Sequence, residues 1–250
     1  MFIRLLALAL FITSTHAWAE TTKSISAGAF YTSGTYGSST STNIMYVPVS
    51  GKIQIDDLFI KLTVPYISIS STGDVVAGMG RVKNSGTTKT TTQSGLGDVV
   101  ASAGYTVFDN NDLMLDLVGN IKFGTADANK NLGTGENDYS AQIDGYYTLN
   151  KTTIFATAGY KVVGAPVGVT VNNIAYGTIG ASQKISDKTS AGAMLDVAQS
   201  SNTFSPGTSE VSVFVSQKIN KTVKVQVSVL KGLSDSSPNY GAGGLITGTF

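Results

Sequence analysis

Apolar residues occupy alternate positions through most of this chain, and no segment beyond the N-terminus keeps a helical period. The pattern is clearest in two late runs, which carry valine at 211, 213 and 215 and at 223, 225, 227 and 229, with mostly polar residues between. Because successive side chains of a strand point to opposite faces, each run predicts a strand with one apolar face. The short segment 219–222 between them predicts a tight turn, and therefore a β-hairpin.

The same unit recurs along the chain and predicts an all-β fold, a transmembrane antiparallel up-and-down β-barrel of about twelve strands. The expected strands cover residues 23–34, 42–55, 58–71, 95–108, 112–124, 137–149, 152–163, 173–186, 189–200, 209–219, 222–232 and 239–250. An even strand number is typical of single-chain bacterial barrels, because both chain ends then lie on the periplasmic side.

The expected connections alternate in length, which supports the same fold. Short turns are expected at 56–57, 109–111, 150–151, 186–188 and 220–221, and longer loops at 35–41, 72–94, 125–136, 164–172, 201–208 and 233–238. Short periplasmic turns and longer extracellular loops are characteristic of outer-membrane barrels. The polar stretch 84–94 could be a mobile outer loop or could fold inward as a constriction.

Residues 1–19 are expected to be a signal peptide, which leaves residues 20–250 for the outer-membrane barrel. Arg4 supplies a positive start, and residues 5–12 form an apolar run that is too short to span a bilayer, which takes about 20 residues. Ala17-Trp18-Ala19 matches the small-x-small cleavage pattern, so the mature chain should begin at Glu20. The alternative is an N-terminal anchor helix.

Composition excludes several classes of function. Charged residues make up 13% of the chain, about half of the ~25% typical of soluble domains. The net charge of +1 argues against a nucleic-acid partner. Cysteine is absent and the single histidine, His16, lies in the expected signal peptide. We therefore expect no histidine-dependent catalysis, no metal site and no cofactor, and hence no enzyme.

Successive side chains of a strand point to opposite faces, so the parity of a residue, its odd or even position in the strand, assigns its side chain to lipid or to the lumen. A charge that faces lipid near the bilayer centre costs about 2–4 kcal/mol, so the polar set must face inward. The candidates to line the lumen are Lys61, Asp98, Asp116, Lys122, Asp138, Asp144, Tyr146, Phe155, Lys161, Asp196 and Phe214. The inward parity also holds Lys52, Lys184, Lys218 and Lys224, together with Phe30, Tyr46, Phe59 and Tyr176.

Two interpretations of these inward residues stay open. The charges could form a structural network in a nearly closed barrel, or they could line a path for permeation. The aromatic rings could stack on a solute or fill the bore by packing. Outward tyrosines near strand ends are expected to anchor the barrel at the membrane interfaces.

Four short segments resemble a known family of outer-membrane proteins. They are Leu62-Thr63-Val64-Pro65-Tyr66, Gly95-Leu96-Gly97-Asp98, Lys122-Phe123-Gly124-Thr125 and Leu132-Gly133-Thr134-Gly135, the last shortly before Asp138-Tyr139. Their order and spacing over residues 44–250 are similar to the family labelled "MetA pathway of phenol degradation". One departure is Gly124, where that family leads us to expect proline. The resemblance implies a transporter for aromatic and other small organic compounds.

These observations favour an outer-membrane channel for small organic solutes, with aromatic compounds as candidates. The alternative is a structural or adhesive barrel with a closed bore that acts through its extracellular loops. The expected partners are outer-membrane lipid, a small-molecule solute and the barrel-insertion machinery. The last would recognise Phe250, the final residue of an alternating strand.

Overall fold

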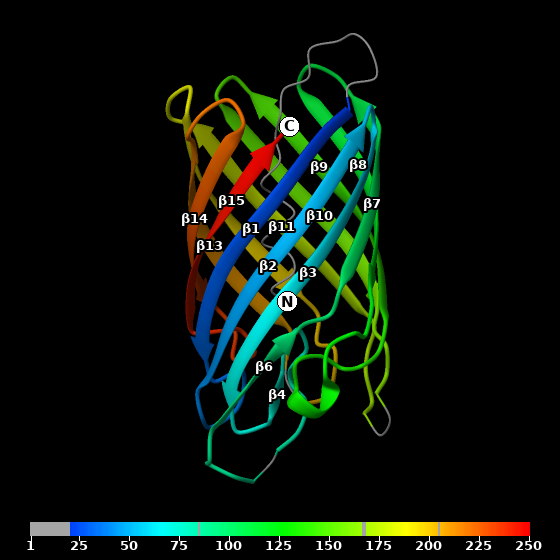
Figure 1. Cartoon of the computed structure of the whole chain (residues 1–250), viewed down its shortest axis with the longest axis vertical. Coiled ribbons are helices and arrows are strands. Elements are labelled where there is room, and N and C mark those ends of the chain that lie inside the picture. Colours follow the sequence, from blue (N-terminus) through cyan, green and yellow to red (C-terminus); the bar gives the residue numbers. More distant parts are fainter. Residues whose placement is uncertain (1–20, 85, 167–168, 205) are drawn as a thin grey trace.

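The computed structural model describes residues 21–84, 86–166, 169–204 and 206–250, and nearly all of them lie in strands or in the links between strands (Figure 1). The signal peptide predicted for residues 1–19 lies outside the described residues. The wall strands are β1 (Thr21–Gly34), β2 (Thr42–Ile55), β3 (Leu58–Ser71), β6 (Thr91–Leu96), β7 (Val100–Asp109), β8 (Leu113–Lys122), β9 (Asp138–Leu149), β10 (Thr152–Val162), β11 (Ile174–Lys184), β12 (Thr189–Ala198), β13 (Thr208–Lys218), β14 (Val223–Gly232) and β15 (Tyr240–Thr249).

Antiparallel pairing of β1 with β15 closes the sheet into a barrel. The two strands pair from Ser24 opposite Thr249 to Ser33 opposite Tyr240. The strands β1 to β3 and the strands β7 to β15 pair in sequence order, and Figure 1 shows them tilted around a common axis. Because β6 and β7 both pair with β3, they fill one place, and the barrel is twelve-stranded as the sequence predicts.

One expected strand differs from the prediction. Residues 95–108 were expected to be continuous, but the chain forms β6 and β7 with a break at residues 97–99. The break lies opposite Pro65 of β3, whose partner changes from β7 at Thr63 to β6 at Tyr66. Proline has no N–H to donate to a sheet, so strand pairing is interrupted there. The Pro65 carbonyl still accepts a hydrogen bond from the Gly97 N–H at 2.8 Å.

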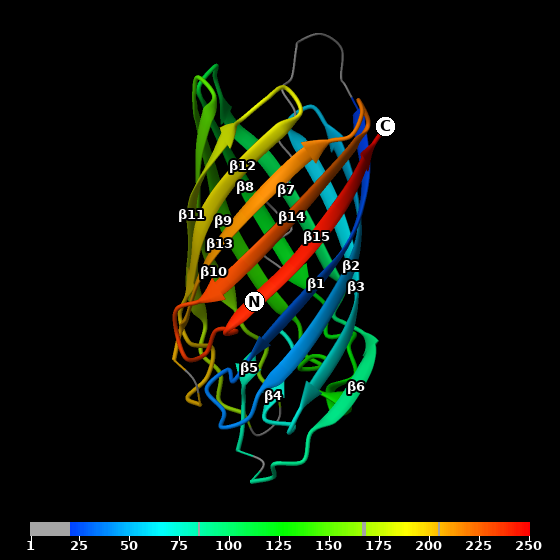
Figure 2. The ribbon, with the colours of Figure 1, turned by 90° about the vertical axis from the view of Figure 1, so that its left-hand side faces the viewer.

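Short turns gather at one end of the barrel with the C-terminus, and the longer loops gather at the other (Figure 2). Three of the short turns are held by a side-chain oxygen, from Asn110, Ser186 or Asn220, that accepts two backbone N–H groups two and three residues ahead. Asp56 and Asn150 take positive φ in two further turns. These residue types favour such turns, so the local sequence specifies this end of the barrel.

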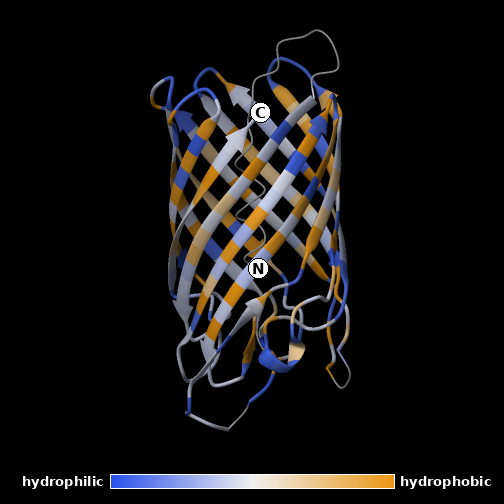
Figure 3. Ribbon diagram, in the orientation of Figure 1, coloured by the Kyte–Doolittle hydropathy of each residue, from blue (hydrophilic) through white to orange (hydrophobic). Residues whose placement is uncertain are grey.

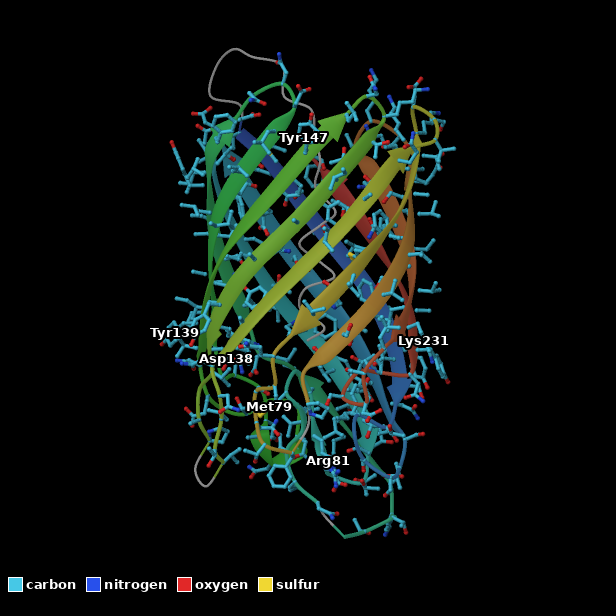
Figure 4. All side chains as sticks on the ribbon, turned by 180° about the vertical axis from the view of Figure 1, so that it is seen from behind. Met79, Arg81, Asp138, Tyr139, Tyr147 and Lys231 are labelled. Atoms are coloured by element: carbon cyan, nitrogen blue, oxygen red, sulfur yellow. The ribbon has the colours of Figure 1, made fainter. Side chains whose placement is uncertain are left out.

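The outer face of the wall is a continuous apolar belt. Along β3, Leu58, Ile60, Leu62, Val64 and Tyr66 are all exposed, and the residues between them are buried or half-buried. Orange and blue alternate along the strands in Figure 3 in the same way. Tyr147 and Tyr139 lie near opposite ends of β9 and both are exposed, which fits interfacial anchors (Figure 4). No helix among the described residues is long and apolar enough to cross a membrane.

A small apolar cluster holds the long-loop end together. Tyr36, Val75, Ala126 and Leu132 come from three loops and pack with Ile44, Ile69 and other wall residues. Burial raises the pKa of the Tyr36 hydroxyl, which is hydrogen-bonded to Thr32 Oγ1 at 2.8 Å. The loops at this end are therefore folded onto the barrel.

The inward-folding part of loop 72–90 is not the polar stretch that the sequence singled out. Residues 75–81 form the hairpin β4 (Val75–Val76) and β5 (Gly80–Arg81), and Val75 is fully buried. The described residues of 86–92 are exposed. The valines carry the hairpin inward because they bury apolar area, whereas Thr and Lys side chains stay in water.

Placing a lysine on the apolar belt should destabilise the folded barrel. Val227 lies in the middle of β14 and is 55% exposed, so Val227→Lys should lower the free energy of unfolding in lipid vesicles by about 2–4 kcal/mol. Ser228→Lys, the matched control on the inner face, should cost much less. Urea titration followed by the mobility of the folded form on gels measures both. Equal losses for the two variants would contradict this assignment of faces.

Candidate functional site: the barrel lumen

The barrel encloses a cavity of about 230 Å³, which we call the inner cavity. Side chains of β2, β3 and β7–β12 line it, together with residues 77–79 of the β4–β5 hairpin, Asp98 in the break before β7 and residues of three further loops. Nine of the eleven candidates from the sequence lie on its wall: Lys61, Asp98, Asp116, Lys122, Asp138, Asp144, Tyr146, Lys161 and Asp196. Phe155 and Phe214 have the inward parity but do not line this cavity.

Four of the lining charges form a paired network at the long-loop end. Lys122 Nζ lies 2.9 Å from Asp98 Oδ2 and 3.4 Å from Asp138 Oδ2, and Lys161 Nζ lies 4.0 Å from the same Asp138 oxygen. The three strands β8, β9 and β10 and the break before β7 are thereby connected on their inner side. Alternating signs satisfy each charge within the network, which is what burial of charge requires.

The same network fixes the loops. Asp98 Oδ1 accepts a hydrogen bond from the Ala126 N–H at 2.9 Å, and Asp138 Oδ1 accepts one from the Gly164 N–H at 3.0 Å. Lys122 also donates to Thr134 Oγ1 at 3.3 Å. These charges therefore hold loops 123–137 and 163–173 against the wall.

A second group of acids follows one hydrogen-bonded row across the wall. Asp116 pairs across strands with Asp144, and the row continues through Thr157 and Thr178 to Asp196. One carboxylate oxygen of each acid accepts a short hydrogen bond from a cross-strand threonine: Thr106 to Asp116 at 2.7 Å, Thr157 to Asp144 at 2.6 Å and Thr178 to Asp196 at 2.6 Å. The repeated Thr–Asp pair orients these acids along the wall of the cavity.

Lysines line a different part of the same cavity. Lys52 and Lys61 are cross-strand partners on β2 and β3, and the Lys52 ammonium lies 4.4 Å from the centre of the Phe59 ring. Apart from the paired network, the cavity therefore presents lysines on β2 and β3 and carboxylates on β8, β9 and β12. Apolar side chains such as Met114, Val118 and Met194 line the same cavity.

Most of the inward aromatic rings lie against glycines of the neighbouring strand. The cross-strand pairs are Phe30 with Gly243, Phe59 with Gly104, Phe155 with Gly180, Tyr176 with Gly159 and Phe214 with Gly192. A Cβ atom at any of these glycines would approach the ring to 2.1–2.5 Å. The rings therefore cover the glycines and lie along the wall, an arrangement that supports strand register and leaves space in the lumen. Sequence reasoning missed these pairs because parity gives the face of a residue but not its cross-strand partner.

Gly124 departs from the pattern of the resembling family for a structural reason. A Cβ atom at this position would lie 2.3 Å from the carbonyl carbon of Gly135, so no side chain fits. Its N–H also donates to Asn137 Oδ1 at 2.9 Å, which a proline could not do. Among the described residues, no group of three or more acidic, histidine or cysteine side chains could hold a metal ion.

Removing the central lysine of the paired network should destabilise the barrel and loosen its loops. Lys122→Met leaves Asp98 and Asp138 close together without their shared cation, so we expect a loss of about 1–3 kcal/mol in the free energy of unfolding. Lys130→Met is the matched control, because its pair with Asp127 is half-exposed. Urea titration of both variants measures the difference. A Lys122→Met protein as stable as the parent would contradict the structural role of the network.

Adding a methyl group to a glycine that lies under an aromatic ring should lower the free energy of unfolding. Gly104→Ala places a methyl group about 2.2 Å from Phe59 Cε1, so the ring must move, and we expect a loss of about 1–3 kcal/mol through overpacking. Gly119→Ala on the adjacent strand is the control, because nothing lies within 4 Å of its added atom. Unfolding titrations compare the two. Equal stability of both variants would show that the Phe59 ring is not held against Gly104.

Comparison with known proteins identifies the fold. No family model matches the chain, and no curated protein matches it, so the family resemblance noted in the sequence stays a prediction. Among solved structures, the COG4313 outer-membrane channel from Pseudomonas putida F1 is similar over 94% of this chain and 97% of its own length, with a TM-score of 0.70 and 13% identity. The KdgM porin matches over 91% of this chain and 99% of its own length with a TM-score of 0.59 and 11% identity, and the NanC porin over 90% and 98% with 0.58 and 9%. The chain therefore has the closed twelve-strand barrel fold of outer-membrane channels.

Proposed function

We propose that this protein is an outer-membrane channel that lets small organic solutes cross through its lumen. The observation that carries the proposal is the inner cavity, which lies inside a closed barrel with an apolar outer belt. The similarity to solved outer-membrane channels and porins supports the same function at the level of fold. The two interpretations of the inward charges then apply to different residues. Some of the charges would hold the structure together, and others would line the path for permeation.

The paired network of Asp98, Lys122, Asp138 and Lys161 would serve mainly as structure, because its charges bind one another and the loops. The permeation path would be lined by Asp116, Asp144, Lys52 and Lys61, which lie on the wall of the inner cavity and are not members of the paired network. Carboxylates and ammonium groups on separate strands would let polar groups of either sign interact with the wall.

We also propose that the solutes include aromatic compounds, as the family resemblance implies. Phe59, Tyr146 and Tyr176 line the cavity, and Met114 and Met194 add polarisable sulfur atoms. A path that mixes these groups with charges suits a compact solute with an apolar body and a polar group.

We also propose that the barrel-insertion machinery recognises Phe250. Its N–H donates to the Lys23 carbonyl at 2.8 Å, and its ring is 76% exposed. The final residue is thus placed at the β1–β15 seam with its ring accessible.

Ion selectivity tests the proposed path. In planar bilayers at low salt, where charges are weakly screened, the parent protein should conduct. Asp116→Asn/Asp144→Asn should shift its permeability toward anions, and Lys52→Gln/Lys61→Gln should shift it toward cations, because each pair removes wall charge of one sign. Swelling of liposomes in small aromatic solutes measures solute flux directly. A parent protein that neither conducts nor passes solutes, beside a conducting porin control, would overturn the proposal and favour the adhesive alternative.

A further inference from the structure

The tip of the β4–β5 hairpin separates two cavities. Beyond the inner cavity lies a smaller outer cavity of about 60 Å³, lined by loop residues such as Tyr36, Pro206 and Ser236. Five residues line both cavities: Ile44, Gly78, Met79, Lys161 and Ser201. Two of these five belong to the hairpin tip, residues 77–79. Figure 4 shows Met79 at the long-loop end, between the walls of the barrel.

The base of the hairpin is firmly attached to the barrel mouth. Val75 is fully buried in the apolar cluster, and the Val82 N–H donates to the Asp74 carbonyl at 2.9 Å. Ser38 Oγ donates to Asp74 Oδ2 at 3.1 Å, and Arg81 Nη1 donates to the Gly37 carbonyl at 2.5 Å. These contacts fix where the hairpin enters the mouth.

The hydrogen bonds from the tip to neighbouring loops are longer. The Ala77 N–H donates to the Asn131 carbonyl at 3.1 Å, and Ser201 Oγ donates to the Met79 carbonyl at 3.5 Å. β4 and β5 form a sheet of their own, and their strand pairing is with each other, through Val75 with Arg81 and Val76 with Gly80. Gly78 and Gly80 both take φ of +80°, so the turn depends on residues that tolerate this conformation.

The surroundings of the tip are rigid by comparison. Asn131 belongs to loop 123–137, which the ion network anchors through Asp98 and Lys122. Ile44 and Lys161 come from the wall strands β2 and β10. The tip, with its longer hydrogen bonds, therefore lies against an anchored loop and two wall strands at the boundary between the two cavities.

We propose that residues 77–79 form the selectivity gate of the channel, with Met79 as the residue that limits which solutes pass from the outer to the inner cavity. The inference rests on the proposed channel function. Met79 lines both cavities together with Ile44, Lys161 and Ser201, so its flexible, polarisable thioether can adapt to an apolar solute while Lys161 and Ser201 offer polar contacts. Passage requires the tip to move while the base stays in place.

A shortened tip tests the gate without disturbing the buried valines. Replacing Ala77-Gly78-Met79 with Asn-Gly keeps Val75, Val76, Gly80 and Arg81, and Asn-Gly suits a two-residue hairpin turn. We expect single-channel conductance and the swelling rate with bulky aromatic solutes to rise several-fold. Met79→Ala should give a smaller rise in the same direction. Unchanged conductance in both variants would overturn the proposal.

A reversible tether tests whether the tip must move. The chain has no cysteine, so Met79→Cys/Ser201→Cys provides one pair of thiols, which a short bifunctional thiol reagent can join through a cleavable disulfide. Linking should reduce solute flux several-fold, and a reductant should restore it. The control is Ser234→Cys/Ser237→Cys, whose parent hydroxyls lie 3.0 Å apart in the β14–β15 loop, and linking this pair should leave flux unchanged.

The outcomes separate the gate from the channel function. If the linked Met79→Cys/Ser201→Cys protein conducts as well as its reduced form, the gate is wrong and the channel stands. If the reduced protein, the shortened-tip variant and the parent all fail to conduct, the channel function itself is wrong.

Discussion

Backbone hydrogen bonding is the constraint on which the rest of this structure depends. Every N–H and C=O group that crosses hydrocarbon needs a partner within the protein, and a sheet meets that need only if its edges join. The pairing of β1 with β15 joins them. Once the sheet is closed, the period of two along each strand separates an apolar face that meets lipid from a polar face that encloses a lumen.

The inner face must satisfy its polar groups and still leave space. The Thr–Asp pairs do so along one row of the wall, because each threonine hydroxyl donates a hydrogen bond to the neighbouring carboxylate. The glycine–aromatic pairs do so by laying rings against the backbone, as with Phe59 over Gly104. Both kinds of pair lie along the wall and leave space in the lumen. Because the pairs depend on strand register, the register supports the proposed passage of solutes.

Much of this architecture follows from the sequence, because strand periodicity and turn residues act locally. The twelve strands, the alternation of turns and loops, and the outward face of residues such as Leu58 and Val227 need only short-range patterns. The break at residues 97–99 and the placement of the β4–β5 hairpin depend on contacts between distant segments, such as Pro65 with Gly97 and Ala77 with Asn131. Local periodicity does not reveal such partners, so it indicates the polar stretch 84–94 as a loop but does not predict the positions of Val75 and Met79.

Site-directed spin labelling along β14 tests the closed two-faced barrel most directly. Single cysteines at successive positions from 223 to 232, in a chain that has no other, would carry a nitroxide whose accessibility to oxygen in lipid and to a water-soluble nickel complex is measured in turn. The account predicts two period-two profiles that are opposite in phase, with oxygen access highest at 225, 227 and 229. Profiles that rise and fall together, or water access on both faces, would contradict it.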